Sequence, residues 1–155
     1  MIIKNVKNLI VLTQLIPYLK NIENIYPEVE HWYINKVIPR VMLEKDIVLV
    51  IYSPENEVAG FAIAKNNKEE KKLCCLIIMP DYQGRGYAIK LIKKIQKELN
   101  EEKLHCSVSE DLLPLYLKIF INHFKWTIDE VQESKYKKGK LEYFFNGKSK
   151  KESEL

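Results

Sequence analysis

One short segment has the residue types and the spacing that suit the binding of an anion: residues 83–88, with the sequence Gln-Gly-Arg-Gly-Tyr-Ala. A strand-like apolar run, Leu73 to Met79, precedes it, and a helical pattern follows it. The two glycines, Gly84 and Gly86, keep bulky side chains away, so a ligand can approach the backbone closely. The first N–H groups of a helix are free and lie at the positive end of the helix dipole. The segment therefore predicts a binding site for phosphate or pyrophosphate.

The helix that follows this turn is defined by its periodicity. Its apolar stripe is Ala88, Leu91, Ile92, Ile95 and Leu99, and its other face carries Lys90, Lys93, Lys94 and Lys97. Pro80 ends the preceding strand because proline cannot donate a hydrogen bond to a sheet. Two phosphate motifs are excluded. The P-loop needs Gly-Lys-Ser/Thr where this chain has Ala-Ile-Lys, and the dinucleotide fingerprint needs a third glycine.

The turn resembles a signature of the GCN5-related N-acetyltransferases, the GNAT family. Gln83, Gly86 and Ala88 fill the three defined positions of the family's Gln/Arg-x-x-Gly-x-Gly/Ala signature. The segment from Leu76 to Ala88 is similar to the family's strand, turn and helix over its full length, and the order of elements is similar over nearly the whole chain. The resemblance implies an enzyme that uses acetyl-coenzyme A to acetylate a primary amine.

The resemblance also implies which residues hold the co-substrate. In the family, backbone amides of this turn bind the pyrophosphate of acetyl-coenzyme A, and the preceding strand pairs with the pantetheine arm. In this chain the corresponding residues are Gln83, Gly84, Arg85, Gly86, Tyr87, Ala88 and Ile89 in the turn, and Leu76, Ile77 and Ile78 in the strand.

The rest of the chain must position this turn, and its patterns predict the following elements. The first strand covers 1–6, and two helices follow it, one running to about 22 and one beginning at 27. Three strands, at 46–53, 58–65 and 73–79, come before the motif helix. After that helix come a strand at 103–108, a helix at 109–123 and two strands at 126–131 and 141–146. Pro39 is expected to end the second helix, and Ser109 to cap the helix after the fifth strand. We therefore predict an α/β fold (α+β, with a mixed sheet), a mostly antiparallel twisted sheet of about seven strands with about four helices. The order resembles the acetyltransferase fold, in which strands four and five splay apart and admit the pantetheine arm.

The composition is that of one folded domain. The chain has 155 residues, 46% of them hydrophobic, and we predict a single domain over 1–146 followed by a polar, disordered tail over 147–155.

The sequence shows neither a run of eighteen apolar residues nor a signal peptide, so we expect a cytoplasmic protein without membrane contacts. The net charge is only +4, and the basic excess near the end lacks the aromatic residues of a nucleic-acid module. Nucleic acid is therefore not expected as a partner.

Three cysteines, Cys74, Cys75 and Cys106, all fall in predicted strands. Their odd number and lack of a spacing pattern argue against disulfides, and no cluster with histidine suggests a metal site. We expect buried free thiols. The acetyl group is therefore expected to pass directly from the thioester to the amine and not through a cysteine.

Acetyl transfer needs a proton donor for the departing thiolate, and the family often uses a tyrosine on the helix after the fifth strand. The resemblance points to Tyr116, which follows Ser109 by seven residues, where the family has an asparagine and then this tyrosine. The usual Gly-Phe pair after the tyrosine is missing, and the nearest equivalent, Lys125-Trp126, lies farther downstream. Aligning the chain on Trp126 would place Ile121 in the tyrosine's position and leave no acid.

The sequence leaves the base, the acceptor and catalysis itself open. The candidate bases are Glu28, Glu30, His105, Glu110 and Asp111, and a water chain to solvent is an alternative. The acceptor site would be walled by Tyr26, Trp32, Tyr33, Trp126 and Tyr136, and small amines, peptide N-termini and protein lysines all remain as acceptors. The alternative function is a catalytically silent regulatory module that binds acyl-coenzyme A. The protein is expected to be a monomer or a homodimer.

Overall fold

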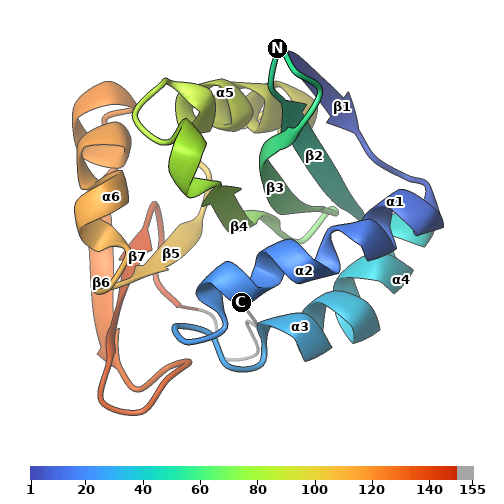
Figure 1. The fold of residues 1–155 in the computed structure, drawn as a ribbon. Coiled ribbons are helices and arrows are strands. Elements are labelled where there is room, and N and C mark those ends of the chain that lie inside the picture. The colour runs from blue at the N-terminus through green and yellow to red at the C-terminus, as the bar shows by residue number, and fades with distance from the viewer. Residues whose placement is uncertain (150–155) are drawn as a thin grey trace.

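Residues 1–149, which the computed structural model describes, contain seven strands in two antiparallel sheets (Figure 1). The first sheet has the order β1-β2-β3-β4, with β1 at Ile2–Asn5, β2 at Asp46–Tyr52, β3 at Val58–Asn66 and β4 at Lys71–Ile78. The second has the order β5-β7-β6, with β5 at Cys106–Ser109, β6 at Ile128–Glu133 and β7 at Leu141–Phe145. The predicted α/β fold with mostly antiparallel strands is confirmed.

The two sheets meet at β4 and β5, which begin side by side and then diverge. A parallel bridge joins Lys72 to His105, and the N–H of Leu73 donates to the carbonyl of His105 at 2.9 Å. Within residues 1–149, the ladder partner of β4 is β3, and that of β5 is β7. Beyond Leu73 the facing edges have no ladder partner across the gap among these residues, and side chains bond only some of their backbone groups, such as the carbonyls of Leu76 and Ile78. The predicted splay of strands four and five is confirmed.

Helices cover both faces of the first sheet because successive side chains of β2 and β3 point to opposite sides. Val48, Val50, Phe61 and Ile63 pack against the helices that lie between β1 and β2 in sequence. These helices are α1 (Leu9–Gln14), α2 (Ile16–Leu19), α3 (Val29–Trp32) and α4 (Ile38–Met42), linked by short helical turns at Lys20–Ile22 and Tyr33–Val37. Leu49, Ile51, Ala62 and Ala64 pack on the other face, against the helix that follows β4.

The helix on that second face, α5 (Tyr87–Leu99), has the predicted amphipathic pattern. Its apolar stripe of Ala88, Leu91, Ile92, Ile95 and Leu99 is buried. A short 3₁₀ turn, Pro80–Tyr82, leads from β4 toward it. The last helix, α6 (Leu113–Leu117), continues into a π-helical segment, Lys118–His123, beside the second sheet. In the described part of the chain, no helix has the length and apolar composition needed to cross a bilayer.

The prediction that Pro39 ends the second helix is wrong. A π-helical segment, Tyr33–Val37, precedes the proline, and α4 carries the helix on to Met42. Pro39 is thus the second residue of α4, which directly follows the π-helical turn. The wider turn before it gives the proline ring the room that an uninterrupted α-helix would deny it.

The prediction that Ser109 caps a helix is also wrong. Ser109 is the last residue of β5 and is paired with Glu142 of β7, whereas α6 begins at Leu113. The side chain of Ser109 still accepts a hydrogen bond from the N–H of Asp111, at 3.3 Å. Pairing with β7 extends the strand beyond the predicted boundary and includes Ser109 in it. The hydroxyl of Ser109 therefore stabilises the turn after the strand and not the start of a helix.

The predicted tail falls only partly within the described part of the chain. Residues 150–155 lie outside it. The N–H of Ser149 donates to Glu130 Oε1 of β6 at 2.8 Å. The division into a domain over 1–146 and a tail over 147–155 stays a prediction.

Candidate functional site

The glycine-rich turn has a backbone conformation that side chains disfavour. Gly84 and Gly86 have φ values of +75° and +80°, in the left-handed region. Gln83 ties the turn to the end of β4, because its side-chain Nε2 donates to the carbonyl of Ile78 at 3.0 Å. The local sequence therefore fixes the direction in which the chain enters α5.

The start of α5 presents free backbone donors. The N–H of Lys90 bonds to the carbonyl of Gly86 at 3.2 Å, so the N–H groups of residues 87–89 have no partner within the helix. The first turn of α5 contains no acidic residue that would repel an anion. Free N–H groups and the positive end of the dipole together suit a phosphate group.

A pocket opens at this helix start, and we call it the helix-start pocket. Its lining is Ile78, Tyr82, Gln83, Gly84, Gly86, Tyr87, Ala88 and Ile89 on one side, and Leu115, Tyr116 and Ile119 on the other. Most of the residues that the resemblance assigned to the turn therefore surround one pocket. Arg85 does not line it, since its guanidinium lies over the ring of Tyr82, 5.5 Å from the centroid.

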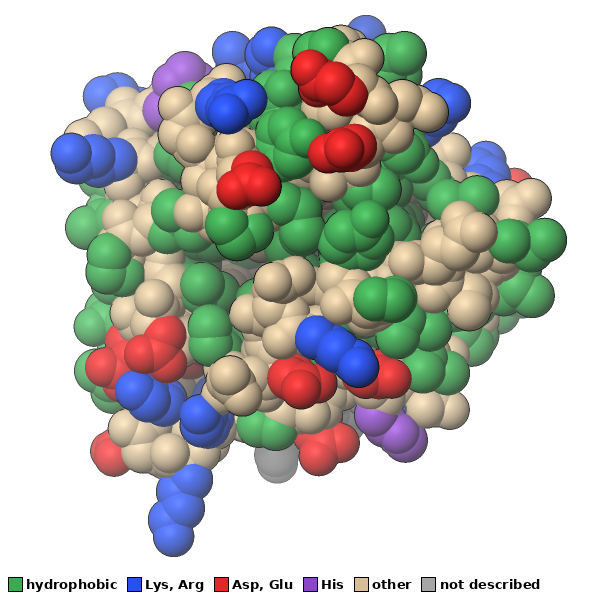
Figure 2. All heavy atoms as spheres, viewed as in Figure 1, with side chains coloured by type: hydrophobic (Ala, Val, Ile, Leu, Met, Phe, Trp, Pro, Cys, Tyr) green, Lys and Arg blue, Asp and Glu red, His purple; other side chains and the backbone are tan. Residues whose placement is uncertain are grey.

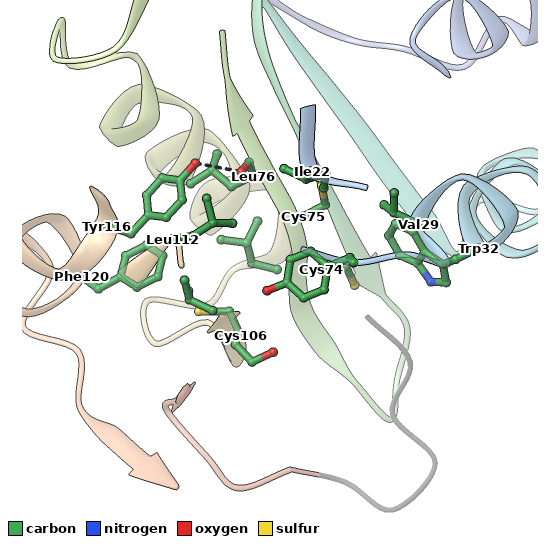
Figure 3. A pocket seen from close by; sticks show the side chains of 14 residues that line it. Ile22, Val29, Trp32, Cys74, Cys75, Leu76, Cys106, Leu112, Tyr116 and Phe120 are labelled. Atoms are coloured by element: carbon green, nitrogen blue, oxygen red, sulfur yellow. Dashed lines mark hydrogen bonds between the residues drawn. The ribbon is translucent and has the colours of Figure 1, made fainter. Parts of the chain in front are cut away.

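A second pocket lies between the diverging strands β4 and β5 (Figure 3), and we call it the splay pocket. Its lining is Leu73, Cys74, Cys75 and Leu76 on β4, Cys106, Ser107 and Val108 on β5, Leu112, Tyr116 and Phe120 after β5, and Ile22, Tyr26, Val29 and Trp32 from the segment between β1 and β2. Leu76 thus lines the splay pocket, whereas the side chain of Ile77 packs in the core on the opposite face of β4. Tyr116 lines both pockets, so the two adjoin at its side chain.

The hydroxyl of Tyr116 points from α6 toward β4 (Figure 3). It donates to the carbonyl of Leu76 at 2.9 Å, and the ring stacks on Phe120 with the centroids 5.7 Å apart. Burial, with a smaller contribution from Cys75, raises the pKa of this phenol well above its ordinary value. Tyr116 is therefore protonated at neutral pH and can donate a hydrogen bond.

The helix after Tyr116 explains why the expected Gly-Phe pair lies farther along the chain. The π-helical segment Lys118–His123 lengthens this helix with wide turns. Lys125 then adopts a φ of +59°, a conformation that glycine favours, and the ring of buried Trp126 lies 4.9 Å from that of Phe120. Ile121 packs against the core and lines neither pocket. The structure thus places Tyr116, and not Ile121, beside both pockets.

A buried carboxylate lies next to the splay pocket. Glu142 of β7 is 3% exposed and accepts hydrogen bonds from Ser107 Oγ at 2.7 Å and from Tyr26 Oη at 3.0 Å. Burial raises the pKa of Glu142 to about 7, although the bonds from Ser107 and Tyr26 and the charge of Lys72 act in the opposite direction. The carboxyl group can therefore gain or lose a proton near neutral pH.

Glu142 was not predicted as a site residue, although its strand carries a signal. Glu142 and Phe144 lie on the same face of β7, and Phe144 is fully buried. An acidic residue on a buried strand face is unusual unless it is paired or functional. The alternation along β7 indicates that Glu142 is buried. It does not indicate the hydrogen-bond partners, Tyr26 and Ser107, because they come from distant segments.

The sequence model described as an acetyltransferase (GNAT) domain matches residues 22–123, which is more than half of the chain. The chain belongs to the GNAT family. The matched range includes the glycine-rich turn, both edges of the splay and Tyr116. Among curated proteins, no sequence matches this GNAT chain.

Solved structures share the GNAT fold. A GNAT-family protein from Desulfovibrio desulfuricans superposes with a TM-score of 0.72 at 12% identity, over 93% of this chain and 96% of that one. An aminoglycoside 6'-N-acetyltransferase complexed with coenzyme A gives a TM-score of 0.70 at 14% identity, over 94% and 95%. A spermidine N-acetyltransferase chimera from Vibrio cholerae and hSSAT gives 0.66 at 15% identity, over 94% of each chain.

In this GNAT domain, the bases expected from the sequence do not line the splay pocket. Glu110 Oε1 accepts a backbone N–H of β7 at 2.9 Å, and Asp111 pairs with a lysine at 3.2 Å. His105 is buried beside the end of the splay, where its backbone bonds to β4. Neither these residues nor Glu28 and Glu30 belong to the pocket lining. The ring of His105 stacks on Phe144, and the other side chains serve turns or ion pairs or lie near the surface.

The three cysteines of the GNAT domain are free and line the splay pocket, but only Cys106 is buried as expected, whereas Cys74 and Cys75 are half-buried. Burial raises the pKa of each thiol. A thiol with a raised pKa is a poor nucleophile at neutral pH, because the thiolate is the reactive form. Within residues 1–149, no group of three or more His, Cys, Asp or Glu side chains is arranged to hold a metal ion.

The surface charge of the GNAT domain is mixed on the face shown in Figure 2. Basic and acidic side chains are interspersed there, with apolar side chains between them, and form no continuous basic stripe. This distribution fits the small net charge of +4. It is not the basic face that a nucleic-acid-binding domain typically presents.

Proposed function

We propose that this chain is an N-acetyltransferase that moves an acetyl group directly from acetyl-coenzyme A to a primary amine. The observation that carries the proposal is the position of Tyr116, at which the helix-start pocket and the splay pocket adjoin. One pocket suits a pyrophosphate, and the other contains open strand edges and a buried carboxylate nearby. A proton donor between them is placed to serve a thioester that reaches from one pocket toward the other.

The chain offers complementary groups to two parts of acetyl-coenzyme A. The pyrophosphate would bind the N–H groups of residues 84–89 at the positive end of α5. The pantetheine amides would pair with the backbone of β4 near Leu76 and Ile78, where β5 has diverged. One solved neighbour is complexed with coenzyme A, which supports acetyl-coenzyme A as the co-substrate.

The proposed reaction is a direct displacement. The amine nitrogen attacks the thioester carbonyl carbon, the C–N bond forms, the C–S bond breaks, and its electron pair moves to sulfur. Tyr116 gives its hydrogen bond and then its proton to the departing thiolate, and it recovers a proton from solvent afterwards. The raised pKa values of Cys74 and Cys106 support this route over an acetyl-cysteine intermediate.

The acceptor is proposed as a primary amine whose nitrogen enters the splay pocket. Aromatic side chains of Tyr26 and Trp32 form part of its wall, and they suit an amine with apolar or planar parts. Two solved neighbours are named for acetylation of aminoglycosides and of spermidine. A cytoplasmic location and a monomeric or homodimeric state stay predictions.

An amine panel with a thiol-detecting reagent tests the proposal. The panel contains spermidine, an aminoglycoside, a peptide with a free N-terminus and a peptide with an internal lysine. Steady release of coenzyme A thiol with at least one amine, above the amine-free rate, supports the enzyme. Binding of acetyl-coenzyme A by calorimetry without thiol release from any amine would favour the silent regulatory module instead.

A further inference from the structure

The reaction proposed above also needs a base, a group that accepts the proton that the acceptor amine loses. We propose that Glu142 receives that proton through the hydroxyl groups of Ser107 and Tyr26. The inference rests on the proposed function, because it assigns a role in the same reaction. It makes Glu142 a proton acceptor that acts through two hydroxyl groups and does not itself touch the acceptor.

The geometry connects the pocket to the carboxylate. Ser107 and Tyr26 line the splay pocket, and Glu142 does not. Both hydroxyl groups donate to Glu142 Oε2, at 2.7 Å from Ser107 Oγ and at 3.0 Å from Tyr26 Oη. Tyr26 Oη also accepts the N–H of Ser109 at 2.9 Å, which holds the phenol in place. An amine in the pocket therefore meets hydroxyl oxygens whose own protons already point to a carboxylate.

The proton balance follows from these bonds. As the C–N bond forms, the amine N–H proton moves to a hydroxyl oxygen, and that hydroxyl passes its original proton to Glu142 Oε2. The hydroxyl stays neutral, and the carboxylate becomes a carboxylic acid. Tyr116 supplies the proton to the thiolate on the other side of the thioester. After the product leaves, Glu142 releases a proton to solvent and Tyr116 takes one up, so the enzyme returns to its starting state.

The surroundings of Glu142 tune it for this role. Burial is the largest effect and raises the pKa to about 7, whereas Ser107, Tyr26 and Lys72 of β4 lower it. The other titratable groups nearby are Cys106 of β5, which senses the charge of Glu142, and Tyr136, whose ring is 5.7 Å from that of Tyr26. On β6, the residue opposite Glu142 is the uncharged Gln132, which donates to Glu130. A base with a pKa near the working pH is largely ionised and still basic enough to accept a proton.

The test is the pH dependence of kcat/KM for wild type and Glu142→Gln, with saturating acetyl-coenzyme A and two amines from the panel. Wild type should show an ionisation near neutral pH that is the same for both amines. Glu142→Gln keeps the size of the side chain and an acceptor oxygen, but it cannot take a proton. We expect kcat/KM to fall by about 10²–10⁴-fold. The ionisation near neutral pH should disappear, so that the rate keeps rising with pH.

Glu133→Gln is the matched control, because it removes one carboxylate from the exposed side of the same sheet. It should leave both the rate and the pH profile as in wild type. Ser107→Ala and Tyr26→Phe each remove one hydroxyl and should each lower kcat/KM at neutral pH, with the rate partly recovered at high pH.

The outcomes separate this inference from the proposed function. If wild type releases thiol and Glu142→Gln keeps the wild-type rate and profile, the inference is wrong and the acetyltransferase stands. If no amine supports thiol release by wild type, both fall. If Glu142→Gln does not fold, the wild-type profile decides: an ionisation near neutral pH shared by both amines supports the inference, and its absence overturns it.

Discussion

The helix-start pocket and the splay pocket are built in different ways. The first takes most of its lining from one continuous stretch, residues 78–89, and contains the backbone N–H groups at the start of α5. The second joins Tyr26, Ser107 and Tyr116 from three separate segments, next to Glu142 from a fourth. Local backbone conformation thus sets the first pocket, whereas packing of distant segments sets the second. Changes in the first should alter binding, and changes in the second should alter turnover.

Tyr116→Phe is expected to have the largest effect on turnover while leaving binding of acetyl-coenzyme A almost unchanged. The substitution removes the proposed proton donor and its bond to Leu76 but keeps the ring that stacks on Phe120. We expect kcat to fall by about 10²–10⁴-fold, because a positioned acid typically contributes that much. Calorimetry should show affinity for acetyl-coenzyme A close to that of wild type.

Tyr143→Phe is the control for this change, since Tyr143 packs against the same core and lines neither pocket. It should leave kcat unaltered. Wild-type turnover by Tyr116→Phe would show that the phenol only fills the core, and the splay pocket would then need another acid.

Gly86→Val should have the opposite effect, on binding. Gly86 has a φ of +80°, which a β-branched residue adopts only with strain, and no protein atom lies within 4 Å of an added Cβ. The substitution should tilt the N–H groups at the start of α5 or obstruct a pyrophosphate there. We expect affinity for acetyl-coenzyme A to fall on the order of 10²-fold, by calorimetry.

Gly139→Val provides a control with the same backbone strain. Gly139 also has a φ of +80° and open space around an added Cβ, but it lies in the loop between β6 and β7. Both variants should lose similar stability, and only Gly86→Val should lose affinity. Equal affinity in the two variants would argue against binding at the helix-start pocket.

Glu142→Gln should change stability in a pH-dependent way. The pKa of Glu142 is raised from 4.5 in its ordinary state to about 7 in the folded protein, so the folded state holds this proton more tightly than the unfolded state. The contribution of Glu142 to stability is therefore present below the lower value and is lost as pH rises through the upper one. The Gln side chain stays neutral at every pH. The free energy of unfolding of the variant should therefore rise relative to that of wild type as pH rises, by at most roughly 3 kcal/mol.

Urea unfolding at about pH 5 and about pH 8 measures this difference. Glu133→Gln, on the exposed side of β6, should show no such trend. A constant difference between Glu142→Gln and wild type across this range would mean that the carboxyl group is already ionised at low pH.

The smallest effect on catalysis is expected at the cysteines. Cys74→Ala and Cys106→Ala should retain most of the wild-type kcat, because burial raises the pKa of both thiols and direct attack does not use them. Cys106 is 2% exposed, so its truncation should cost about 1 kcal/mol of stability through the small cavity left behind. Loss of transfer by a folded cysteine variant would replace direct attack with an acetyl-cysteine route.

The sequence predicted the strand, turn and helix around residues 83–88 because each depends on near neighbours. Glycines at positive φ, a proline after the strand and an apolar stripe are local signals, and α5 follows them closely. Pro39 and Ser109 were misjudged for the opposite reason. A π-helical segment makes room for the proline, and pairing with β7 draws the serine into a strand.

The sequence by itself determined the family resemblance, the glycine-rich turn and the amphipathic helix behind it. Only the tertiary structure decided that Tyr116 rather than Ile121 reaches both pockets, and that Glu142 faces the hydroxyl groups of Ser107 and Tyr26. A backbone N–H takes its direction from the φ and ψ of a few adjacent residues, which short motifs record. A buried carboxylate takes its pKa and its partners from segments more than thirty residues away, and only packing brings those together.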